Sequence, residues 1–404
     1  MNRIIITILG LLLSLNSFSQ KVSISLFNEL SLNTILITPT EGSYKLITAK
    51  SEIRLSTDQI IYLSKVGDSI LVRDANSNLG TWARVSIVGQ TENDIIRVKP
   101  ILPSFPARKY NDNLSFYVEF NRLMTINMID REKYIASVVE AEAGPNKEDE
   151  FYKAQSLIAR TFALAHLEKH KGEGFNLCDG THCQAYKGII GLDKDIYKAT
   201  LATDGEVIVD TTMQFITAAF HSNCGGYTAN SQDVWLTSKP YLVSVEDHHC
   251  LNSRNASWEV SVPLNKWKAF LQTKGVDTLA ITDFKQYNFK PKEKERPVYY
   301  PIANQKIPLI QIRSNFKLRS AFFSIQVAKK DVRIIGRGYG HGVGLCQEGA
   351  MQMAVRGWKY DKIIRYYYKN VKIVNISEVS PSASIIDVYV VNKDTTKVDS
   401  IKIK

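Results

Sequence analysis

The stretch Asp130-Arg-Glu-Lys-Tyr-Ile-Ala-Ser-Val-Val-Glu-Ala-Glu142 is where this chain of 404 residues changes from strand-like to helical sequence. Asp130 is a residue type preferred at the N-cap of a helix. Apolar side chains then recur with the spacing of one helix face, at Tyr134, Ile135, Val138 and Val139. The segment Ala143-Gly-Pro145 breaks this pattern, because proline cannot continue a helix. We therefore predict a helix that starts at Asp130 and stops before residue 143.

A second helix is expected immediately downstream. Asn146 is a favourable cap, and acidic residues follow in the first turn, where they interact well with the helix dipole. The helix is expected to run to about His170, and the side chains predicted to be buried include Phe151, Ala154, Ile158 and Ala165. Further on, the sequence predicts a strand over 206–220, a helix over 263–274 in a Lys/Pro-rich segment, strands over 308–335, and helices over 345–357 and 361–369.

Upstream of Asp130 the sequence has the pattern of short β-strands. Apolar and polar residues alternate at 22–26, 44–47 and 70–73, and turn-forming residues follow at 74–78. Together with the helices, this pattern predicts an α+β fold with a β-rich N-terminal part followed by a mixed α/β region. The expected organisation is a signal peptide (1–19), a β-rich region (20–115), a motif-bearing region (116–375) and a C-terminal tail (376–404) with one alternating segment at 385–391.

The first 19 residues have the pattern of a secretory signal peptide. Arg3 gives a positive start, an apolar run follows, and small residues precede a cleavage point at Gln20. We expect an exported protein of the periplasm or cell envelope with no stable membrane span, because the apolar run is short; an uncleaved N-terminal anchor is the alternative. Loss of Arg3 lowers the net charge from +11 to +10. This charge favours an anionic envelope polymer as partner, and export argues against nucleic acid.

Residues 336–344 read Gly-Arg-Gly-Tyr-Gly-His-Gly-Val-Gly, with glycine at every second position. In an extended chain one face would be bare backbone, and Tyr339 and His341 would lie on the other face. A phosphate-binding P-loop needs Lys-Ser/Thr after its last glycine, and a dinucleotide fingerprint needs Gly-x-Gly-x-x-Gly, so the spacing excludes both. We expect a surface that a ligand or another backbone approaches closely.

Six blocks of sequence follow one another along the chain: Tyr134–Glu142, Lys153–Thr161, Cys183–Tyr186, His221–Thr228, Asp233–Val245 and Gly338–Ala350. This ordered series resembles the SpoIID/LytB family of exported bacterial proteins that act on peptidoglycan, and the resemblance covers about residues 115–375. It implies a SpoIID-like catalytic domain with a long glycan cleft. The implied enzyme is a lytic transglycosylase, a lyase that cleaves MurNAc–GlcNAc bonds in glycan strands without stem peptides and leaves 1,6-anhydro-MurNAc ends.

The resemblance places Glu142 on the family's catalytic glutamate, in its Val-Val-x-x-Glu motif, with Glu140 as the rival. A carboxyl group on a turn of small residues at a helix end can be half-buried, which favours the protonated form of a general acid. Ordinary glycosidases need two carboxylates, whereas in a lytic transglycosylase the sugar's own 6-hydroxyl attacks the anomeric carbon. One group can then protonate the leaving oxygen and afterwards accept the hydroxyl proton.

The other matched positions are expected to line the glycan cleft. The predicted substrate-binding residues are Gln155, Arg160, Gln184, Tyr186, His221, Ser222, Tyr227, Tyr339 and His341. Arg160 is suited to hold a carboxylate through two parallel hydrogen bonds, with a structural role as the alternative. Aromatic candidates for stacking on sugar rings are Trp235, Tyr186 and Tyr339. No proton-transfer step is assigned to His221 or His341.

The segment Cys178-Asp-Gly-Thr-His182-Cys183 places two thiols and an imidazole within six residues. Members of the family bind zinc in this region through similar residues, so the resemblance implies a structural zinc site made by Cys178, His182 and Cys183. A closed site needs a fourth ligand, which His170, or alternatively His166, can supply. A Cys178–Cys183 disulfide is the other possibility for an exported protein.

Three of the five cysteines lie outside that segment. Cys224 falls within the His-Ser-x-x-Gly-Gly block of the family pattern, and Cys250 closely follows the next block, so we predict a Cys224–Cys250 disulfide. Cys346 is then expected to be a free, buried thiol beside the glycine run. A catalytic pair of Cys346 with His341 is a rival that the family pattern does not use.

Two other functions compete with the transglycosylase. The first is a non-catalytic peptidoglycan-binding protein or an enhancer of a cell-wall amidase, a role also associated with the LytB side of the family. The second is a metallohydrolase centred on the Cys/His cluster. The expected partners are peptidoglycan glycan strands and, for the first alternative, a cell-wall amidase.

Overall fold

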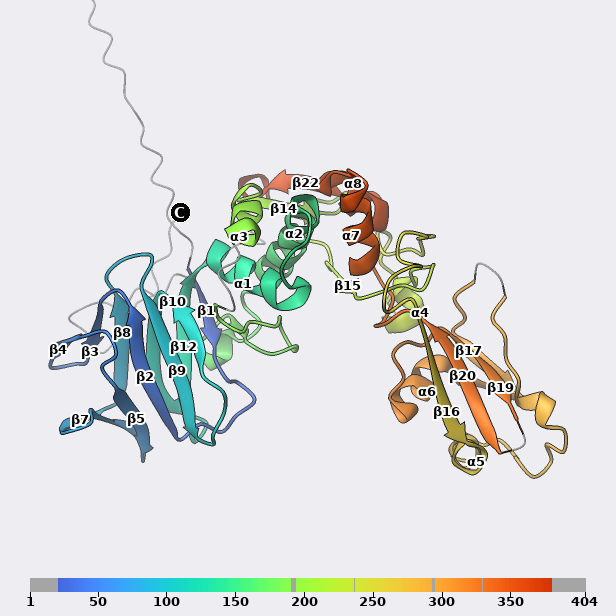
Figure 1. Ribbon diagram of the computed structural model, residues 1–404, viewed down its shortest axis with the longest axis horizontal. Coiled ribbons are helices and arrows are strands. Elements are labelled where there is room, and N and C mark those ends of the chain that lie inside the picture. Colours follow the sequence, from blue (N-terminus) through green and yellow to red (C-terminus); the bar gives the residue numbers. More distant parts are fainter. Residues whose placement is uncertain (1–20, 190–193, 236, 293–294, 329, 380–404) are drawn as a thin grey trace, which may run out of the picture.

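The computed structural model describes residues 21–189, 194–235, 237–292, 295–328 and 330–379 (Figure 1). The predicted signal peptide (1–19) and the alternating segment at 385–391 therefore lie outside the described residues. Helices and strands are both present, with the strands concentrated in the first third of the chain, which confirms the predicted α+β class. None of the helices in the described ranges is long and apolar enough to cross a membrane.

The N-terminal part is built from two β-layers that share one core and are antiparallel except for the parallel pair of β1 with β13. The seven-stranded sheet has the order β13 (Leu177–Cys178), β1 (Lys21–Ser25), β12 (Arg122–Asp130), β11 (Asn113–Glu119), β8 (Arg84–Gly89), β3 (Tyr44–Ile47) and β4 (Glu52–Leu55). The six-stranded sheet has the order β10 (Arg108–Asn111), β9 (Ile95–Leu102), β2 (Thr34–Glu41), β5 (Ile61–Val66), β6 (Ser69–Arg73) and β7 (Asn78–Trp82). Alternation along β6 and β8 buries Ile70, Val72, Val85 and Ile87. The predicted boundary at residue 115 falls within β11.

The helical middle of the chain begins where the sequence predicted it. Helix α1 (Arg131–Ala143) is capped by Asp130, whose side chain accepts the backbone N–H of Lys133, and it ends at Gly144 with a φ of 68°. Helix α2 (Asp149–Ala165) is shorter than predicted at both ends. Asn146 has a φ of 60° and does not cap it, and the chain has left the helix before His170. Of the core residues predicted for α2, Ala165 alone is exposed, because it is the last residue of the helix.

The C-terminal segments return to this helical middle. Helices α7 (Gln347–Val355) and α8 (Tyr360–Tyr367) confirm the two predicted ones, and both contact α2. The predicted strand over 206–220 is confined to its two ends, β14 (Glu206–Val209) and β15 (Phe220–His221). Strand β14 pairs antiparallel with β22 (Lys372–Asn375), and β15 pairs parallel with β21 (Leu345–Cys346). A third helix, α3 (Lys194–Leu201), packs against α1 and α2.

Residues 257–337 form a lobe with its own apolar core. Strands β16 (Ser257–Pro263), β20 (Asp331–Arg337) and β19 (Phe323–Val327) make a three-stranded sheet, flanked by α5 (Leu264–Gln272), α6 (Leu309–Phe316) and the hairpin of β17 (Tyr299–Ile302) with β18 (Gln305–Pro308). Helix α5 confirms the helix predicted over 263–274. The strand prediction is wrong for 309–316, which is helical because Leu309 and Ile312, three residues apart, are both buried on one helix face.

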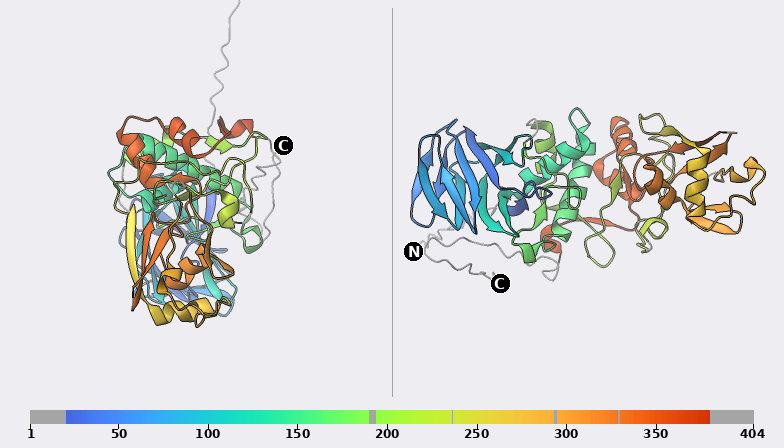
Figure 2. Two further views of the ribbon diagram at one scale, coloured as in Figure 1. Left: turned by 90° about the vertical axis from the view of Figure 1, so that its right-hand side faces the viewer. Right: turned by 90° about the horizontal axis from the view of Figure 1, so that it is seen from below.

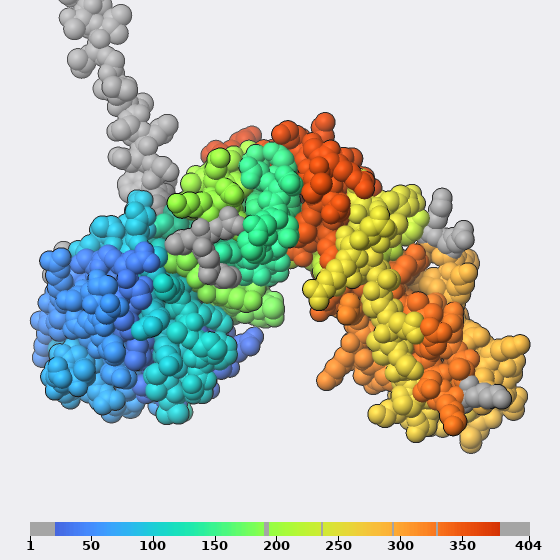
Figure 3. Space-filling model, in the orientation of Figure 1, coloured from blue at the N-terminus to red at the C-terminus, as the bar shows by residue number. Residues whose placement is uncertain are grey.

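The parts are arranged as an arch (Figure 1). Helices α1, α2, α7 and α8 form its middle, the two β-layers lie at one end, and the 257–337 lobe lies at the other, an order that Figure 2 also shows from below. The space-filling view shows a broad hollow on one side of the arch, between the β-layers and the lobe (Figure 3). Helix α1 and the short helix α4 (Ser231–Trp235) border this hollow.

Candidate active site

Glu142 lies in the last turn of α1, next to the small residues that end the helix. Its side chain is half-buried, and burial raises the pKa of its carboxyl group above the ordinary value. A hydrogen bond from the backbone N–H of Ala185 and the charge of Lys187 partly oppose this shift. The carboxyl group of Glu142 therefore stays protonated to a higher pH than that of an exposed glutamate, and it is held in one orientation, as a general acid requires. Glu140, the rival, lies half a turn earlier on the same helix.

The segment that contacts Glu142 is held by two buried side chains. The amide of Gln184 accepts a hydrogen bond from the hydroxyl of Tyr134 at 3.2 Å and donates to the carbonyl of Ala159 at 3.3 Å. The hydroxyl of Tyr186 donates to Oδ1 of Asn127 at 2.7 Å. Gln184 and Tyr186 were predicted to bind sugar hydroxyls. Both are buried and already partnered, so they fix the residue between them, Ala185, beside Glu142.

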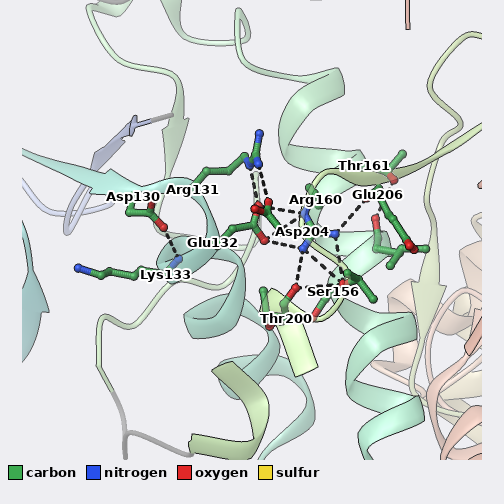
Figure 4. Close-up of polar contacts among 12 residues, drawn as sticks. Asp130, Arg131, Glu132, Lys133, Ser156, Arg160, Thr161, Thr200, Asp204 and Glu206 are labelled. Atoms are coloured by element: carbon green, nitrogen blue, oxygen red, sulfur yellow. Dashed lines mark hydrogen bonds and ion pairs between the residues drawn. The ribbon is translucent and has the colours of Figure 1, made fainter. Parts of the chain in front are cut away.

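Arg160 lies in the middle of α2 and is fully buried. Its guanidinium binds the carboxylate of Glu132 on α1, with an Nη2–Oε2 distance of 2.5 Å and Nε 3.1 Å from both carboxylate oxygens (Figure 4). The remaining N–H groups donate to the carbonyls of Thr200 and Glu206. The carboxylate that Arg160 holds is therefore the protein's own, which matches the structural alternative, and no guanidinium surface is left for substrate.

Gln155 is the fourth of the expected cleft residues that the structure buries, after Gln184, Tyr186 and Arg160. Its side chain is on the covered face of α2, and neither atom of its amide has a hydrogen-bond partner within the described parts of the chain. A buried amide without partners costs free energy, and the buried position of Gln155 keeps its side chain off the surface.

The four predicted metal ligands come together in space. The ligand atoms of His170, Cys178, His182 and Cys183 all lie within 4.8 Å of one another. Cys183 Sγ is 3.4 Å from His170 Nε2 and 4.0 Å from His182 Nδ1, and Cys178 Sγ is 3.7 Å from His182 Nδ1. A tetrahedral zinc site with ordinary bond lengths has ligand–ligand distances of about 3.4–3.8 Å. The arrangement therefore fits a closed site of two thiolates and two imidazoles. The sequence offered His170 or His166 as the fourth ligand, and the structure brings His170 to the other three residues.

The metal-ligand segment is anchored on the edge of the seven-stranded sheet. Cys178 lies in β13, which pairs parallel with β1, and the carboxylate of Asp179 accepts the backbone N–H groups of Phe27 and Asn28. The segment leads directly into Gln184 and Ala185, which contact Glu142 and its helix. A metal bound here would hold together the loop that orients Glu142, without touching the carboxyl group itself.

A second group of predicted residues meets where β15 and β21 pair. The ring centroids of His221 and His341 are 5.6 Å apart, and that of Trp235 is 5.3 Å from His341. Burial, the nearby His341 and the charge of Arg296 hold the pKa of His221 well below its ordinary value, and burial lowers the pKa of His341 to about 4. Both rings are therefore neutral at physiological pH, which suits hydrogen bonding and not acid catalysis.

The remaining predicted contacts divide between exposed rings and paired polar groups. Trp235 is 40% exposed and Tyr339 46% exposed, so part of each side chain is open to the solvent. The hydroxyl of Tyr227 donates to Oε1 of Glu246 at 2.6 Å. Oγ of Ser222 accepts the amide of Asn255 at 3.3 Å. Trp235 and Tyr339 are thus the residues of this group best placed to stack on sugar rings.

The glycine run does not offer bare backbone to a ligand. A Cβ at Gly336 would meet the indole of Trp258 at 2.0 Å, and one at Gly344 would meet the carbonyl oxygen of Ala219 at 2.1 Å. Other parts of the protein likewise cover Gly338, Gly340 and Gly342. From Gly338 onward each glycine has a positive φ, so the segment is not an extended strand. The prediction that another group approaches this backbone closely is confirmed, and the approaching groups are other residues of the same protein.

Substitution of Gly344 by Ala is expected to destabilise the fold by about 2–3 kcal/mol, because it combines a φ of 72° with a clash against backbone. Gly357→Ala is the matched control, since Gly357 has a φ of 82° but nothing within 4 Å of its Cβ position. The control is expected to lose only the conformational part, about 1 kcal/mol. Equal losses in chemical unfolding would show that the close approach at Gly344 contributes nothing.

Sequence reasoning missed two residues that shape this region, Arg296 and Glu348. Arg296 donates to the carbonyls of Cys224 and Tyr227 at 3.0 Å and fills the space beside Gly342. Glu348 accepts an amide N–H from each of two asparagines, Asn223 and Asn255, at 2.6 Å. Glu348 lies within one of the six blocks, so its motif was a usable signal. Arg296 follows an irregular Lys/Pro-rich segment that carries no periodic pattern.

Comparisons with known proteins agree with this arrangement. Residues 119–209, which contain α1, α2 and the metal-ligand segment, match the family described as SpoIID, stage II sporulation protein. Stage II sporulation protein D of Bacillus subtilis (strain 168) is 29% identical over 280 residues, which is 62% of this chain and 76% of that protein. The chain is thus similar to proteins of the SpoIID/LytB family.

Two further relatives show how far the SpoIID/LytB similarity extends. Stage II sporulation protein D of Bacillus amyloliquefaciens is 29% identical over 287 residues, covering 67% of this chain and 79% of that protein. The amidase enhancer of Bacillus subtilis (strain 168) is 26% identical over 269 residues, covering 54% of this chain and 37% of that protein. The chain thus spans little more than a third of the amidase enhancer's length.

Proposed function

We propose that this protein is a lytic transglycosylase that cleaves MurNAc–GlcNAc bonds in denuded peptidoglycan strands, with Glu142 as its single acid/base. Similarity to the SpoIID/LytB family supports a function at the cell wall. The observation that carries the finer proposal is the half-buried carboxyl group of Glu142, whose pKa is raised by burial and whose orientation is fixed by Ala185.

One carboxyl group is sufficient for this reaction. Protonated Glu142 donates its proton to the glycosidic oxygen as the bond to the anomeric carbon breaks. The 6-hydroxyl of the same MurNAc then bonds to that carbon, and the carboxylate takes the hydroxyl proton, which restores the acid. No water is consumed, and the product carries a 1,6-anhydro ring. The exposed rings of Trp235 and Tyr339 are proposed to support sugar units of the strand.

The protein is proposed to bind one structural zinc ion through His170, Cys178, His182 and Cys183. The ligand set and its distances fit a closed tetrahedral site, which has no open position for a water or substrate. This speaks against the metallohydrolase alternative. The ion's contribution would be to fold the loop that leads to Ala185 and so to keep its N–H group on Glu142.

The decisive test of the proposed function is mass analysis of products from amidase-treated glycan strands incubated with the exported protein. Products that end in 1,6-anhydro-MurNAc are expected. Reducing MurNAc ends would instead identify a hydrolase, and the transglycosylase step would be rejected. Intact strands would reject both.

A second candidate follows from the match to the amidase enhancer. In this role the protein binds glycan without cleaving it and stimulates a cell-wall amidase. The two functions separate in one experiment with purified amidase and intact cell walls. Stimulation of peptide release by the Glu142→Gln variant as well as by wild type would favour the enhancer, because the stimulation would not need the acid.

The zinc proposal predicts an effect of a residue that touches a ligand and not the metal. Oε1 of Glu173 is 2.5 Å from Nδ1 of His170 and orients that ring toward the cluster. Glu173→Gln is expected to weaken zinc binding about 10- to 100-fold, measured by competition with a chromophoric chelator. Glu168→Gln is the control, since exposed Glu168 binds only Lys171 nearby and is expected to change nothing. Unchanged affinity in Glu173→Gln would contradict the predicted role of His170.

A further inference from the structure

A second buried cluster of metal-ligand side chains lies beside the paired strands β15 and β21. It consists of Cys224, Asp247, Cys250 and Cys346, each fully buried, with ligand atoms that all lie within 4.8 Å of one another. Three segments far apart in the sequence supply them: the loop after β15, the loop at 247–250 and the residue that precedes α7. The proposed acid and the first metal-ligand group contain none of these residues.

The predicted Cys224–Cys250 disulfide is absent. All five cysteines are free, and the sulfur atoms of Cys224 and Cys250 are 3.4 Å apart. Cys224 Sγ is also 3.3 Å from Oδ2 of Asp247. A tetrahedral zinc site needs about 3.8 Å between two sulfur ligands and about 3.5 Å between sulfur and oxygen. The cluster therefore needs shifts of a few tenths of an ångström to hold a metal ion.

One sulfur atom of the cluster, that of Cys346, accepts hydrogen bonds from two backbone N–H groups. Sγ of Cys346 accepts the N–H groups of Cys224 at 3.3 Å and of Gly349 at 3.4 Å. A neutral thiol is a weak acceptor, whereas a thiolate bound to a metal keeps negative charge that N–H groups stabilise. Two backbone donors on the buried sulfur of Cys346 indicate a position prepared for a thiolate.

The carboxylate is oriented in the same way. Asp247 Oδ1 accepts the N–H of His249 at 2.9 Å, and Oδ2 accepts the hydroxyl of Tyr367 at 2.9 Å. These bonds direct Oδ2 toward Cys224 and leave it with capacity for one further contact. Asp247 is thus a positioned ligand with its own supporting contacts, as in other protein metal sites.

We propose that Cys224, Asp247, Cys250 and Cys346 form a second, closed structural site for a zinc-class divalent cation. Binding releases the three thiol protons, and three thiolates, one carboxylate and the cation leave a formal charge of about −2. The two backbone N–H groups on Cys346 Sγ and the guanidinium of Arg296, which donates to the Cys224 carbonyl, offset part of this charge. Soft thiolate ligands favour zinc over magnesium or calcium.

The site would join three segments at once, where a disulfide joins two. Asn223, next to Cys224, donates to Glu348, and Glu348 follows Cys346 by two residues. The ion would thereby fix the loops that carry His221 and His341 against each other. This role is independent of Glu142 and of the proposed reaction.

The test is the zinc content of full-length protein purified with reductant and dialysed against a slight excess of Zn²⁺, measured by native mass spectrometry. Wild type is expected to bind two ions per chain. Cys178→Ser, which removes a ligand of the first site, is expected to keep one ion. X-ray absorption spectroscopy at the zinc edge is expected to show that the zinc ion bound by this variant has three sulfur neighbours and one oxygen neighbour. Cys346→Ser is expected to lose the ion of the second site only.

The proposal is overturned if Cys178→Ser binds no zinc, or if its zinc has one sulfur and two nitrogen neighbours, as the remaining ligands of the first site would give. A Cys224–Cys250 disulfide in wild type purified with reductant, detected by peptide mapping, would overturn it as well. Should Cys346→Ser not fold, Cys178→Ser and wild type still decide, because neither result depends on that variant. If the first site binds no zinc even in wild type, the expected spectrum of Cys178→Ser is still three sulfur neighbours and one oxygen, so the two zinc proposals are tested separately.

Discussion

Glu142→Gln is expected to reduce the rate of glycan cleavage at least about 100-fold and up to about 10⁴-fold, because the amide can neither donate nor accept the transferred proton. The substitution keeps the size of the side chain and its ability to accept the Ala185 N–H, so the fold and strand binding are expected to persist. The measurement is the rate of appearance of 1,6-anhydro ends from denuded strands, with binding followed by co-sedimentation.

Glu140→Gln is the matched control, since Glu140 lies on the same helix two residues earlier. It is expected to retain activity within a few-fold of wild type. The opposite pattern, with Glu140→Gln inactive and Glu142→Gln active, would move the acid to Glu140. Full activity in both variants would show that neither carboxyl group carries the reaction.

The pH dependence follows from the same carboxyl group. Burial raises the pKa of Glu142, and the acid must be protonated to act on the glycosidic oxygen. The cleavage rate is therefore expected to fall as pH rises through that raised pKa. Lys187→Met removes a nearby positive charge that opposes the shift, so this limb is expected to move to higher pH. If the pH at which the cleavage rate falls is the same in Lys187→Met and wild type, a group other than Glu142 is responsible for that fall.

Arg160→Met is expected to lower the free energy of unfolding by about 3 kcal/mol, because it removes the fully buried one of the two guanidinium groups that bind the carboxylate of Glu132. The loss arises in the interior between α1 and α2, and Arg131 stays as the other charged partner of Glu132 (Figure 4). Chemical unfolding monitored by circular dichroism measures the change.

The paired variant Arg160→Met with Glu132→Leu tests the mechanism of that loss. Removing both charges replaces the ion pair by apolar contacts and is expected to recover most of the stability, as buried pairs often allow. If the double variant is as unstable as Arg160→Met alone, the contacts of Arg160 with Thr200 and Glu206 carry the stability instead.

Local sequence signals were sufficient for the elements that depend on local contacts. Helix α1 has an N-cap, an apolar face and a terminating glycine within one short stretch, and each determined the structure as expected. The four ligands of the first metal-ligand group lie within 14 residues, so their proximity was visible in the sequence. Helix α6 was misread because a short apolar run fits a strand and a buried helix equally well.

Contacts between distant segments were beyond that reasoning. Arg160 and Glu132 are 28 residues apart, and nothing near either residue indicates the other. Cys224 and Cys346 are separated by 122 residues, so the sequence suggested a pair of cysteines where the structure brings three together with Asp247. The residues that cover the glycine run, Trp258 and Ala219 among them, likewise come from other parts of the chain.

The 257–337 lobe enters and leaves the rest of the protein at one point. Its first strand and its last lie side by side, with Ser257 opposite Arg337, and the indole of Trp258 donates to the carbonyl of Gly338 at that junction. A module attached through two adjacent strands can be gained, lost or exchanged without interrupting the chain that surrounds it. This end of the arch can therefore change without a change in the helix that carries Glu142.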